Sequence, residues 1–429
     1  MLRRLLLALA GLGAVAVVAL LAFAWQPAIA PISPPAASSF APGLVAEGEI
    51  LAEAGNCIAC HTAPGGRPGA GGRAFSIKIG TFYSTNITPD PATGIGTWSE
   101  AAFLRALREG VSRDGRQLFP VFPFDHFTML ADSDIQALYA YLMTRPPVQA
   151  VDRPNTVPFP LDVRALQALW KAIYFKRGPY RADPNRDAEW NRGAYIAEGL
   201  GACGACHTPR NALGAEQVGH PYGGALFDGS WVATPLDVSP SPARWSKAEF
   251  FTYLRTGESP PHGVALGPMR TVVKGLAKLP DSDLKAIAAY FISLNRPSGA
   301  PPEPSLAKAI TPMPPSAANE EPGLTLYRTH CAACHEAGST APGAARSPLP
   351  LTSPLWIELR AHNFVHPVLD GIDGSDGLPG AMPAFRDKLT DDELAMLTDY
   401  VRAWRTNALG WPALLKDLAR IRAKPVSQP

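Results

Sequence analysis

The chain opens with an unbroken apolar run from Leu5 to Trp25. Two arginines precede this run, and the small-residue sequence Ala28-Ile29-Ala30 follows it. A run of about 20 apolar residues can cross a bilayer, whereas the apolar part of a signal peptide is usually about 7 to 15 residues long. The pattern therefore favours a membrane anchor over a signal peptide for residues 1–30, and in both cases the rest of the chain is exported.

Three later segments place apolar residues at helical spacing behind an acidic start, which predicts three amphipathic helices. They read DSDIQALYAYLM from Asp132, DSDLKAIAAYFISL from Asp281 and TDDELAMLTDYVRAW from Thr390. In the third segment, Thr390 and Glu393 have the spacing of a capping box. A shorter helix-forming stretch that begins with glycine lies upstream of each: Gly48–Ala54, Gly193–Leu200 and Gly323–Thr329. The chain therefore contains an internal repeat of three units.

The composition indicates several compact units joined by stiff connectors. The chain has 429 residues, of which 46% are apolar, and this length allows roughly two to four domains. Its 45 prolines gather in the stretches between the repeats. The net charge is only +2 and the basic residues are scattered, so nothing in the charge pattern indicates a nucleic-acid partner.

All six cysteines lie in three copies of the pattern C-x-x-C-H, one in each repeat. This spacing lets two thiols reach the vinyl groups of one porphyrin while the next residue turns its imidazole toward the iron. Disulfides would leave the histidines unexplained, three sites cannot pair up around zinc, and a thioredoxin-like dithiol lacks the histidine. We therefore predict three covalent haem c groups. The thioether anchors are Cys57, Cys60, Cys203, Cys206, Cys331 and Cys334, and the proximal iron ligands are His61, His207 and His335.

The predicted fold is mainly α, with three tandem class I cytochrome c-type haem domains behind the N-terminal segment. Each domain consists of a helix, a haem attachment, an irregular loop and a closing helix. The domains span residues 42–145, 191–297 and 323–406, separated by a connector at 146–190 and a Pro-rich linker at 298–322. The connector contains a helical stretch, Val163–Tyr174, which we expect to pack against a haem domain or a partner. The tail, 407–429, has an apolar stripe that suits either a membrane surface or its own domain.

Each haem of an electron carrier needs a second axial ligand, usually methionine or histidine. Met269 and Met382 stand in Gly/Pro-rich stretches ahead of closing helices, and we predict that they are the distal ligands of the second and third haems. Met143 and Met396 fall inside closing helices and are expected in the core, and Met313 falls in the linker. Three histidines are rival ligands, which we expect to be exposed or hydrogen-bonded loop residues: His262, His362 and His366.

The first repeat lacks a methionine at the matching position. Trp98 aligns with Trp245 at an offset of 147 residues, and the same offset places Phe122 opposite Met269. A phenyl ring cannot ligate iron. His126 follows closely and is the preferred distal ligand of the first haem, Met129 is the alternative, and an open or water-filled site is a third interpretation.

These motifs resemble the three-haem cytochrome c subunits of membrane-bound bacterial dehydrogenases for alcohol, gluconate, sorbitol and aldehydes. The resemblance rests on the three C-x-x-C-H sites and on YSTNITPDPATGIGTWSEAAFLRALREGV, CGACHTPRNALGA and GAMPAF, and it covers about residues 42–405. FPVFPF replaces a YPAMPY-like sequence of the alcohol dehydrogenase branch. FPFDHFT resembles instead the branch that pairs with molybdenum hydroxylases oxidising nicotinate, isoquinoline or aldehydes.

The resemblance implies an electron-transfer subunit rather than an enzyme. It would take electrons from a dehydrogenase partner, with a molybdenum/iron–sulfur type favoured over a quinoprotein or flavoprotein, and pass them to ubiquinone, a soluble cytochrome or a terminal oxidase. It would lie on the periplasmic side of the inner membrane, anchored by its N-terminal segment or bound peripherally. Two other classes stay open: a peroxidase-like multihaem enzyme with an open distal site at the first haem, and a haem-based sensor, although no output module is visible.

Overall fold

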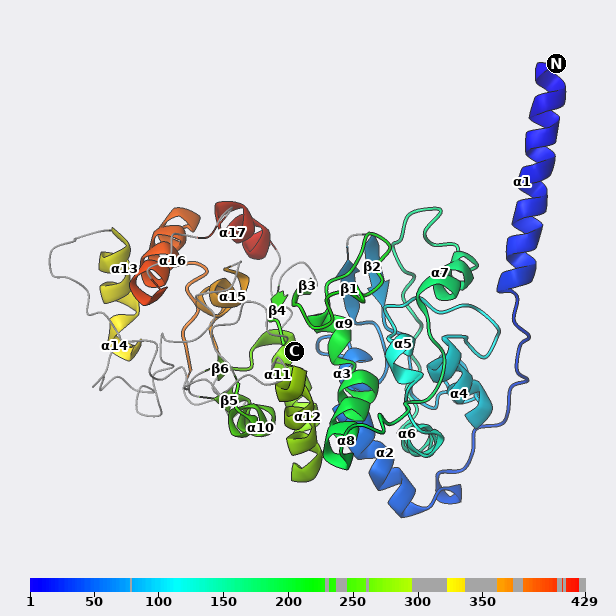
Figure 1. Cartoon of the computed structure of the whole chain (residues 1–429), viewed down its shortest axis with the longest axis horizontal. Coiled ribbons are helices and arrows are strands. Elements are labelled where there is room, and N and C mark those ends of the chain that lie inside the picture. Colours follow the sequence, from blue (N-terminus) through cyan, green and yellow to red (C-terminus); the bar gives the residue numbers. More distant parts are fainter. Residues whose placement is uncertain are drawn as a thin grey trace. The chain divides into compact units, whose positions relative to one another are not determined.

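A computed structural model of the chain describes residues 1–77, 79–227, 231–236, 245–259, 262–294, 322–335, 361–372, 381–406, 411 and 414–423 (Figure 1). The described residues are mainly helical, as predicted. They divide into two compact units, of which the first contains residues 1–205 and 211–215 and the second contains the rest. The division runs through the predicted second domain, whose boundaries stay a prediction, and residues 298–321 of the predicted linker lie outside the described part.

The first unit begins with α1, which the remaining elements of the unit follow in chain order. Its helices are α1 (Leu2–Ala24), η1 (Ala37–Ser39), α2 (Pro42–Ala54), α3 (Cys57–Cys60), α4 (Glu100–Glu109), α5 (Phe124–Phe127), α6 (Asp132–Met143), α7 (Leu166–Tyr174), α8 (Ala188–Ala194) and the π-helix η2 (Tyr195–Leu200). Strands β1 (Ala74–Ile77) and β2 (Gly80–Tyr83) form an antiparallel hairpin. Helix α9 (Cys203–His207) crosses from the first unit into the second.

The second unit is built in the same manner from helices and short hairpins. Its helices are α10 (Lys247–Thr256), α11 (Gly267–Leu276), α12 (Asp281–Leu294), α13 (Pro322–His330), α14 (Ala332–His335), α15 (His362–Asp370), α16 (Asp391–Thr406) and α17 (Leu414–Ala423). Its two antiparallel hairpins pair β3 (Ala225–Phe227) with β4 (Trp231–Ala233) and β5 (Glu258–Ser259) with β6 (Gly263–Val264).

The predicted helix pairs of the first and third repeats cross at a glycine. A Cβ atom on Gly48 of α2 would lie 1.9 Å from the carbonyl oxygen of Ala137 on α6. A Cβ atom on Gly323 of α13 would lie 2.5 Å from the carbonyl oxygen of Met396 on α16. Glycine therefore lets the two backbones approach closely, and a larger residue would push the helices apart. This contact explains the glycines seen near the start of the upstream helices.

Several details of the sequence-based picture are confirmed and others are wrong. Thr390 and Glu393 exchange both bonds of the predicted capping box. Met143 is buried, as predicted, but Met396 is 40% exposed and does not belong to the core. The predicted irregular loops contain the helices α4, α10 and α11, because each segment carries its own capping residues and apolar face.

The connector and the tail both form helices that dock on protein. Helix α7 begins at Leu166, three residues later than predicted, and contacts α1. Helix α17 buries its apolar stripe, Leu414, Leu418 and Ile421, in the core of the third repeat with α15 and α16. Of the two interpretations of the tail, the structure supports docking on its own domain.

Candidate haem sites and axial ligands

A left-handed residue stands directly before the first two C-x-x-C-H sequences. Asn56 (φ 56°) precedes Cys57, and Ala202 (φ 44°) precedes Cys203. A positive φ is uncommon for residues other than glycine and turns the chain sharply between the upstream helix and the cysteine turn. The equivalent bend in two repeats indicates that the backbone is shaped to present each cysteine pair beside its core.

The six cysteines form no disulfide with one another. Burial raises the pKa of Cys57 to about 12 and that of Cys331 to about 11, and the neighbouring thiol of each pair adds to the increase. Reactive dithiols of the thioredoxin type have lowered pKa values. The thiols are therefore held neutral and inert toward disulfide exchange, which fits attachment sites better than a redox dithiol.

The proximal histidines of the first two repeats are held in the same way. The Nδ1 atom of His61 lies 2.6 Å from the carbonyl oxygen of Thr85, and the Nδ1 atom of His207 lies 2.7 Å from that of Thr234. Burial lowers the pKa of both imidazoles, although the bond to each carbonyl opposes the decrease. Metal-binding histidines characteristically give their other ring N–H to such an acceptor and ligate in the neutral form. Both residues therefore fit the role of a proximal iron ligand through Nε2.

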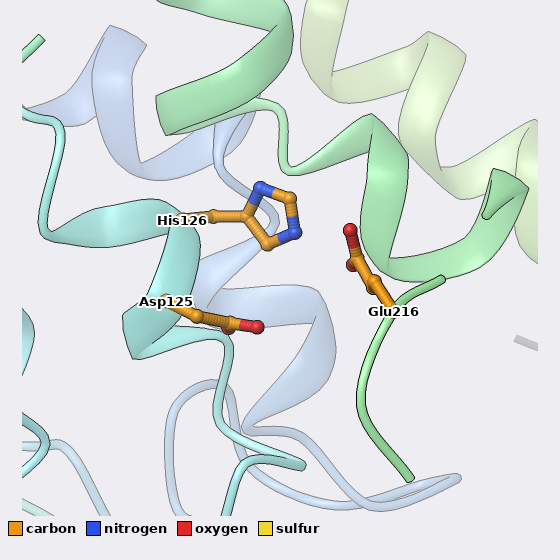
Figure 2. Close-up of side chains that lie close together, drawn as sticks. All are labelled: Asp125, His126 and Glu216. Carbon is orange, nitrogen blue, oxygen red and sulfur yellow. The ribbon is translucent and has the colours of Figure 1, made fainter. Parts of the chain in front are cut away.

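His126 is held like these proximal histidines. It projects from the single turn of α5, next to Asp125 (Figure 2). Its ring is buried, and its Nδ1 atom lies 2.6 Å from the carbonyl oxygen of Glu198 on η2. An acceptor at Nδ1 fixes the ring orientation and favours the tautomer that ligates through Nε2. A backbone carbonyl thus orients His126 as it orients His61 and His207.

Met129, the alternative ligand, lies against η2 as well. Its carbonyl oxygen accepts a hydrogen bond from the backbone N–H of Tyr180. A Cβ atom on Gly199 of η2 would lie 3.6 Å from the Cβ atom of Met129, so this side chain starts out beside the helix. Phe122 packs on Phe127, with ring centroids 5.5 Å apart. Both residues therefore have a packing role that accounts for them.

Met269 lies on a helix rather than in the predicted loop. It is the third residue of α11 and is half-buried. The helix begins at Gly267, whose φ of 51° is left-handed and where a Cβ atom would lie 2.5 Å from the indole ring of Trp231. The same ring of Trp231 stacks on His366 at a centroid distance of 4.3 Å. Trp231 thus fixes where the Met269 segment starts.

Met382 lies in an extended stretch ahead of α16. It exchanges two backbone hydrogen bonds with Ile372, 2.8 and 3.0 Å long, and it is half-buried against the core of the third repeat. The neighbouring residues 373–380 and the stretch after His335 lie outside the described residues. The backbone pairing holds Met382 beside its core, as a distal ligand requires.

The three rival histidines are buried, and none is the exposed loop residue that the sequence suggested. His262 stacks on Trp245 at a centroid distance of 3.5 Å, and its Nε2 atom lies 3.5 Å from a carboxylate oxygen of Glu249. His362 and His366 lie on α15, with carboxylates of Asp417 and Asp370 within 3.7 and 3.4 Å of their Nδ1 atoms. Sequence spacing could not reveal these contacts, because their partners are far away or on a helix that was not predicted.

Comparison with known proteins places the chain in a family. Residues 45–146 match the family model described as cytochrome c, and residues 318–401 match cytochrome C oxidase, cbb3-type, subunit III. The chain is 36% identical to the gluconate 2-dehydrogenase cytochrome c subunit of Pantoea cypripedii, over 88% of this chain and 89% of that protein. It belongs to the cytochrome c subunits of dehydrogenases. The fructose dehydrogenase cytochrome subunit of Gluconobacter japonicus is also 36% identical, over 88% of this chain and 82% of that protein.

A longer relative is more similar in sequence. The chain is 44% identical to a nicotinate dehydrogenase subunit of Pseudomonas putida over 95% of its own length, and it spans about a third of that protein, 34%. The gluconate and fructose relatives are cytochrome subunits of dehydrogenases, so the chain is an electron-transfer subunit rather than a catalytic one. Covalent haem c is the cofactor of its cytochrome c domains.

Proposed function

We propose that this subunit carries three covalent haems c and relays electrons from a dehydrogenase partner to ubiquinone, a soluble cytochrome or a terminal oxidase. The observation that carries the proposal is the threefold C-x-x-C-H sequence, with the His61 and His207 rings each fixed through Nδ1 to a backbone carbonyl. Bound haem supplies a reversible one-electron iron couple, and the protein sets its potential through the axial ligands and burial.

The proposed axial ligands differ among the three haems. Met269 and Met382 serve the second and third, and His126 serves the first. The Nδ1 contact of His126 with Glu198 supports this choice over Met129. An imidazole in place of a thioether lowers the reduction potential, so the first haem would be the low-potential centre.

The partner is proposed to be a dehydrogenase of the molybdenum/iron–sulfur type on the periplasmic side of the inner membrane. The higher identity to the nicotinate dehydrogenase protein than to the sugar and alcohol dehydrogenase cytochromes supports this type. The N-terminal helix α1 is proposed as the membrane anchor. Its length and apolar surface support this role, because about 34 Å of helix matches a hydrocarbon core of about 30 Å.

The haem count can be tested on the purified full chain. We expect the intact mass to exceed that of the polypeptide by three haem groups, and the extracted haem to reach three per chain. Replacing both cysteines of one pair, for example Cys57→Ala with Cys60→Ala, should remove one haem and leave two. A mass equal to that of the amino acids alone would refute covalent attachment.

Phe122 favours one other function, a peroxidase-like enzyme with an open distal face at the first haem. Carbon monoxide separates the two, because it binds rapidly to five-coordinate ferrous haem. The proposal predicts no rapid binding by the reduced native protein and rapid binding by one haem after His126→Ala. Rapid binding by one haem of the unchanged protein would support the enzyme instead.

A further inference from the structure

The end of the anchor helix α1 is built into the first unit. The side chain of Gln117, which is buried, donates from Nε2 to the carbonyl oxygen of Ala24 over 2.8 Å. The guanidinium group of Arg105 donates to the carbonyl oxygen of Pro27 over 2.7 Å, and the backbone N–H of Ile29 donates to the carbonyl oxygen of Arg113. Cleavage after Ala30 would remove three acceptors or donors that buried groups use, at a cost of about 1 to 3 kcal/mol each. The segment therefore behaves as part of the fold.

The same glutamine ties α7 to the end of α1. The Oε1 atom of Gln117 accepts a hydrogen bond of 2.7 Å from Nζ of Lys171, which also donates to the carbonyl oxygens of Glu109 and Gly110. The ring of Trp170 packs on Phe124, at a centroid distance of 6.2 Å. One face of α7 is thus held against the first unit at the level where α1 ends, and Figure 1 shows the two helices side by side there.

The other face of α7 is apolar and exposed. Leu169 and Ile173 are 44% and 68% exposed, and together with Ala172 and Lys176 they have the spacing of one helical stripe. Phe159 in the preceding loop is 82% exposed. Lys176 and Arg177 follow directly and add positive charge. An apolar helix face bordered by basic residues is the pattern of a helix that lies in the headgroup region of a membrane.

We propose that the exposed face of α7, with Phe159, rests on the lipid surface of the bilayer that α1 crosses. This inference rests on the proposed role of α1 as a retained anchor. The occupant is lipid rather than a protein, because Gln117 joins this face to a helix whose whole apolar length is exposed. Trp25, at the end of α1 and 70% exposed, suits the same interfacial level. The surface would hold the first haem domain close to the membrane instead of letting it swing on a tether.

The test uses the full-length haem protein in vesicles of phosphatidylethanolamine and phosphatidylglycerol that contain a lipid with a photoreactive acyl chain. Labelled peptides are then identified by mass spectrometry. We expect label on α1 and on the peptide that contains residues 159–177. The variant Leu169→Glu/Ile173→Glu should lose label on that peptide roughly tenfold and keep it on α1. Ile50→Glu, at an exposed position of α2 in the same unit, is the matched control and should change neither.

The possible outcomes separate this inference from the proposal on which it rests. Label on α1 but not on residues 159–177 of the unchanged protein would overturn the α7 surface and leave the anchor standing. A mature chain that begins after Ala30 would overturn the anchor and the α7 surface together, while the haem count would still support electron transfer. The mapping on the unchanged protein needs no variant to fold.

Discussion

The distal segments of the first two repeats begin alike. Helices α4 and α10 both start at a serine cap, and both end at a glycine in the left-handed conformation. In both, an arginine of the last turn pairs with the first acidic residue of the closing helix: Arg108 with Asp132, and Arg255 with Asp281. The scaffold that surrounds the haem is therefore repeated down to single interactions.

The same segments then end differently. The offset between the repeats rises from 147 residues at Trp98 and Trp245 to 149 at the closing helices, so the second segment is two residues longer. The first forms one turn with His126, which η2 holds through the Glu198 carbonyl, and the second forms a ten-residue helix with Met269, which begins against Trp231. The comparison teaches that the scaffold is constrained by packing, whereas the ligand segment changes wherever another element can brace it.

Exchanging the two ligands should have the largest effect. His126→Met should raise the potential of one haem and Met269→His should lower that of another, each by on the order of 100 mV, because imidazole favours the ferric iron more than a thioether does. Potentiometric titration of the visible spectrum measures both. Met143→Leu, a change at a buried core methionine, is the control and should shift no potential. An unaltered low-spin spectrum after His126→Ala would remove His126 from the comparison.

Crowding the start of α11 should damage only the second repeat. Gly267→Ala places a methyl group against Trp231 at a left-handed position, and we expect a loss of about 3 kcal/mol of stability together with weaker ligation by Met269. Gly214→Ala is the control, because Gly214 also has a positive φ (79°) but nothing within 4 Å of its added methyl group. It should cost about 1 kcal/mol. Urea unfolding followed by haem absorbance compares the two, and equal losses would contradict a specific contact with Trp231.

The two repeated arginines should differ in cost because they differ in burial. The side chain of Arg108 is 7% exposed and that of Arg255 is 29% exposed. Arg108→Met deprives the buried Thr128 carbonyl and Asp132 of their donor and should cost about 2 to 3 kcal/mol, whereas Arg255→Met should cost about 1 kcal/mol. The same unfolding experiment measures both. A larger loss for Arg255→Met would show that burial does not decide the difference.

The smallest effect is expected where the first repeat is joined to η2 by a tyrosine. The Tyr195 hydroxyl accepts from the backbone N–H of Ala131 over 2.9 Å and donates to Asp134 over 2.5 Å. Tyr195→Phe should cost about 1 kcal/mol and speed amide exchange at Ala131. Tyr180→Phe, which loses only a bond to Asn191, should leave that amide protected. Unchanged exchange at Ala131 in both variants would mean that this joint does not stabilise the distal segment.

The haem-binding residues and most helices could be predicted from the sequence because their signals are local. A cysteine pair and the following histidine attach one porphyrin through neighbouring positions, and a helix shows itself by its apolar period and by capping residues such as Thr390 and Glu393. The hairpin strands and α15 were missed because short elements of two to nine residues carry little periodic signal.

The residues of the axial ligands could be proposed from the sequence, but their support could not. His126 is 72 residues from the carbonyl that orients it, and Gln117 is 93 residues from the end of the helix that it holds. Likewise, the sequence shows an apolar stripe on α17 and another on α7, yet the first is buried and the second is exposed.

The sequence by itself determined the chemistry, because covalent haem attachment and helix periodicity depend on residues that are neighbours in the chain. The tertiary structure alone decided how each candidate ligand is oriented and which apolar face remains exposed. Hydrogen bonds and burial between distant segments depend on how the helices pack, and no spacing along the chain encodes them.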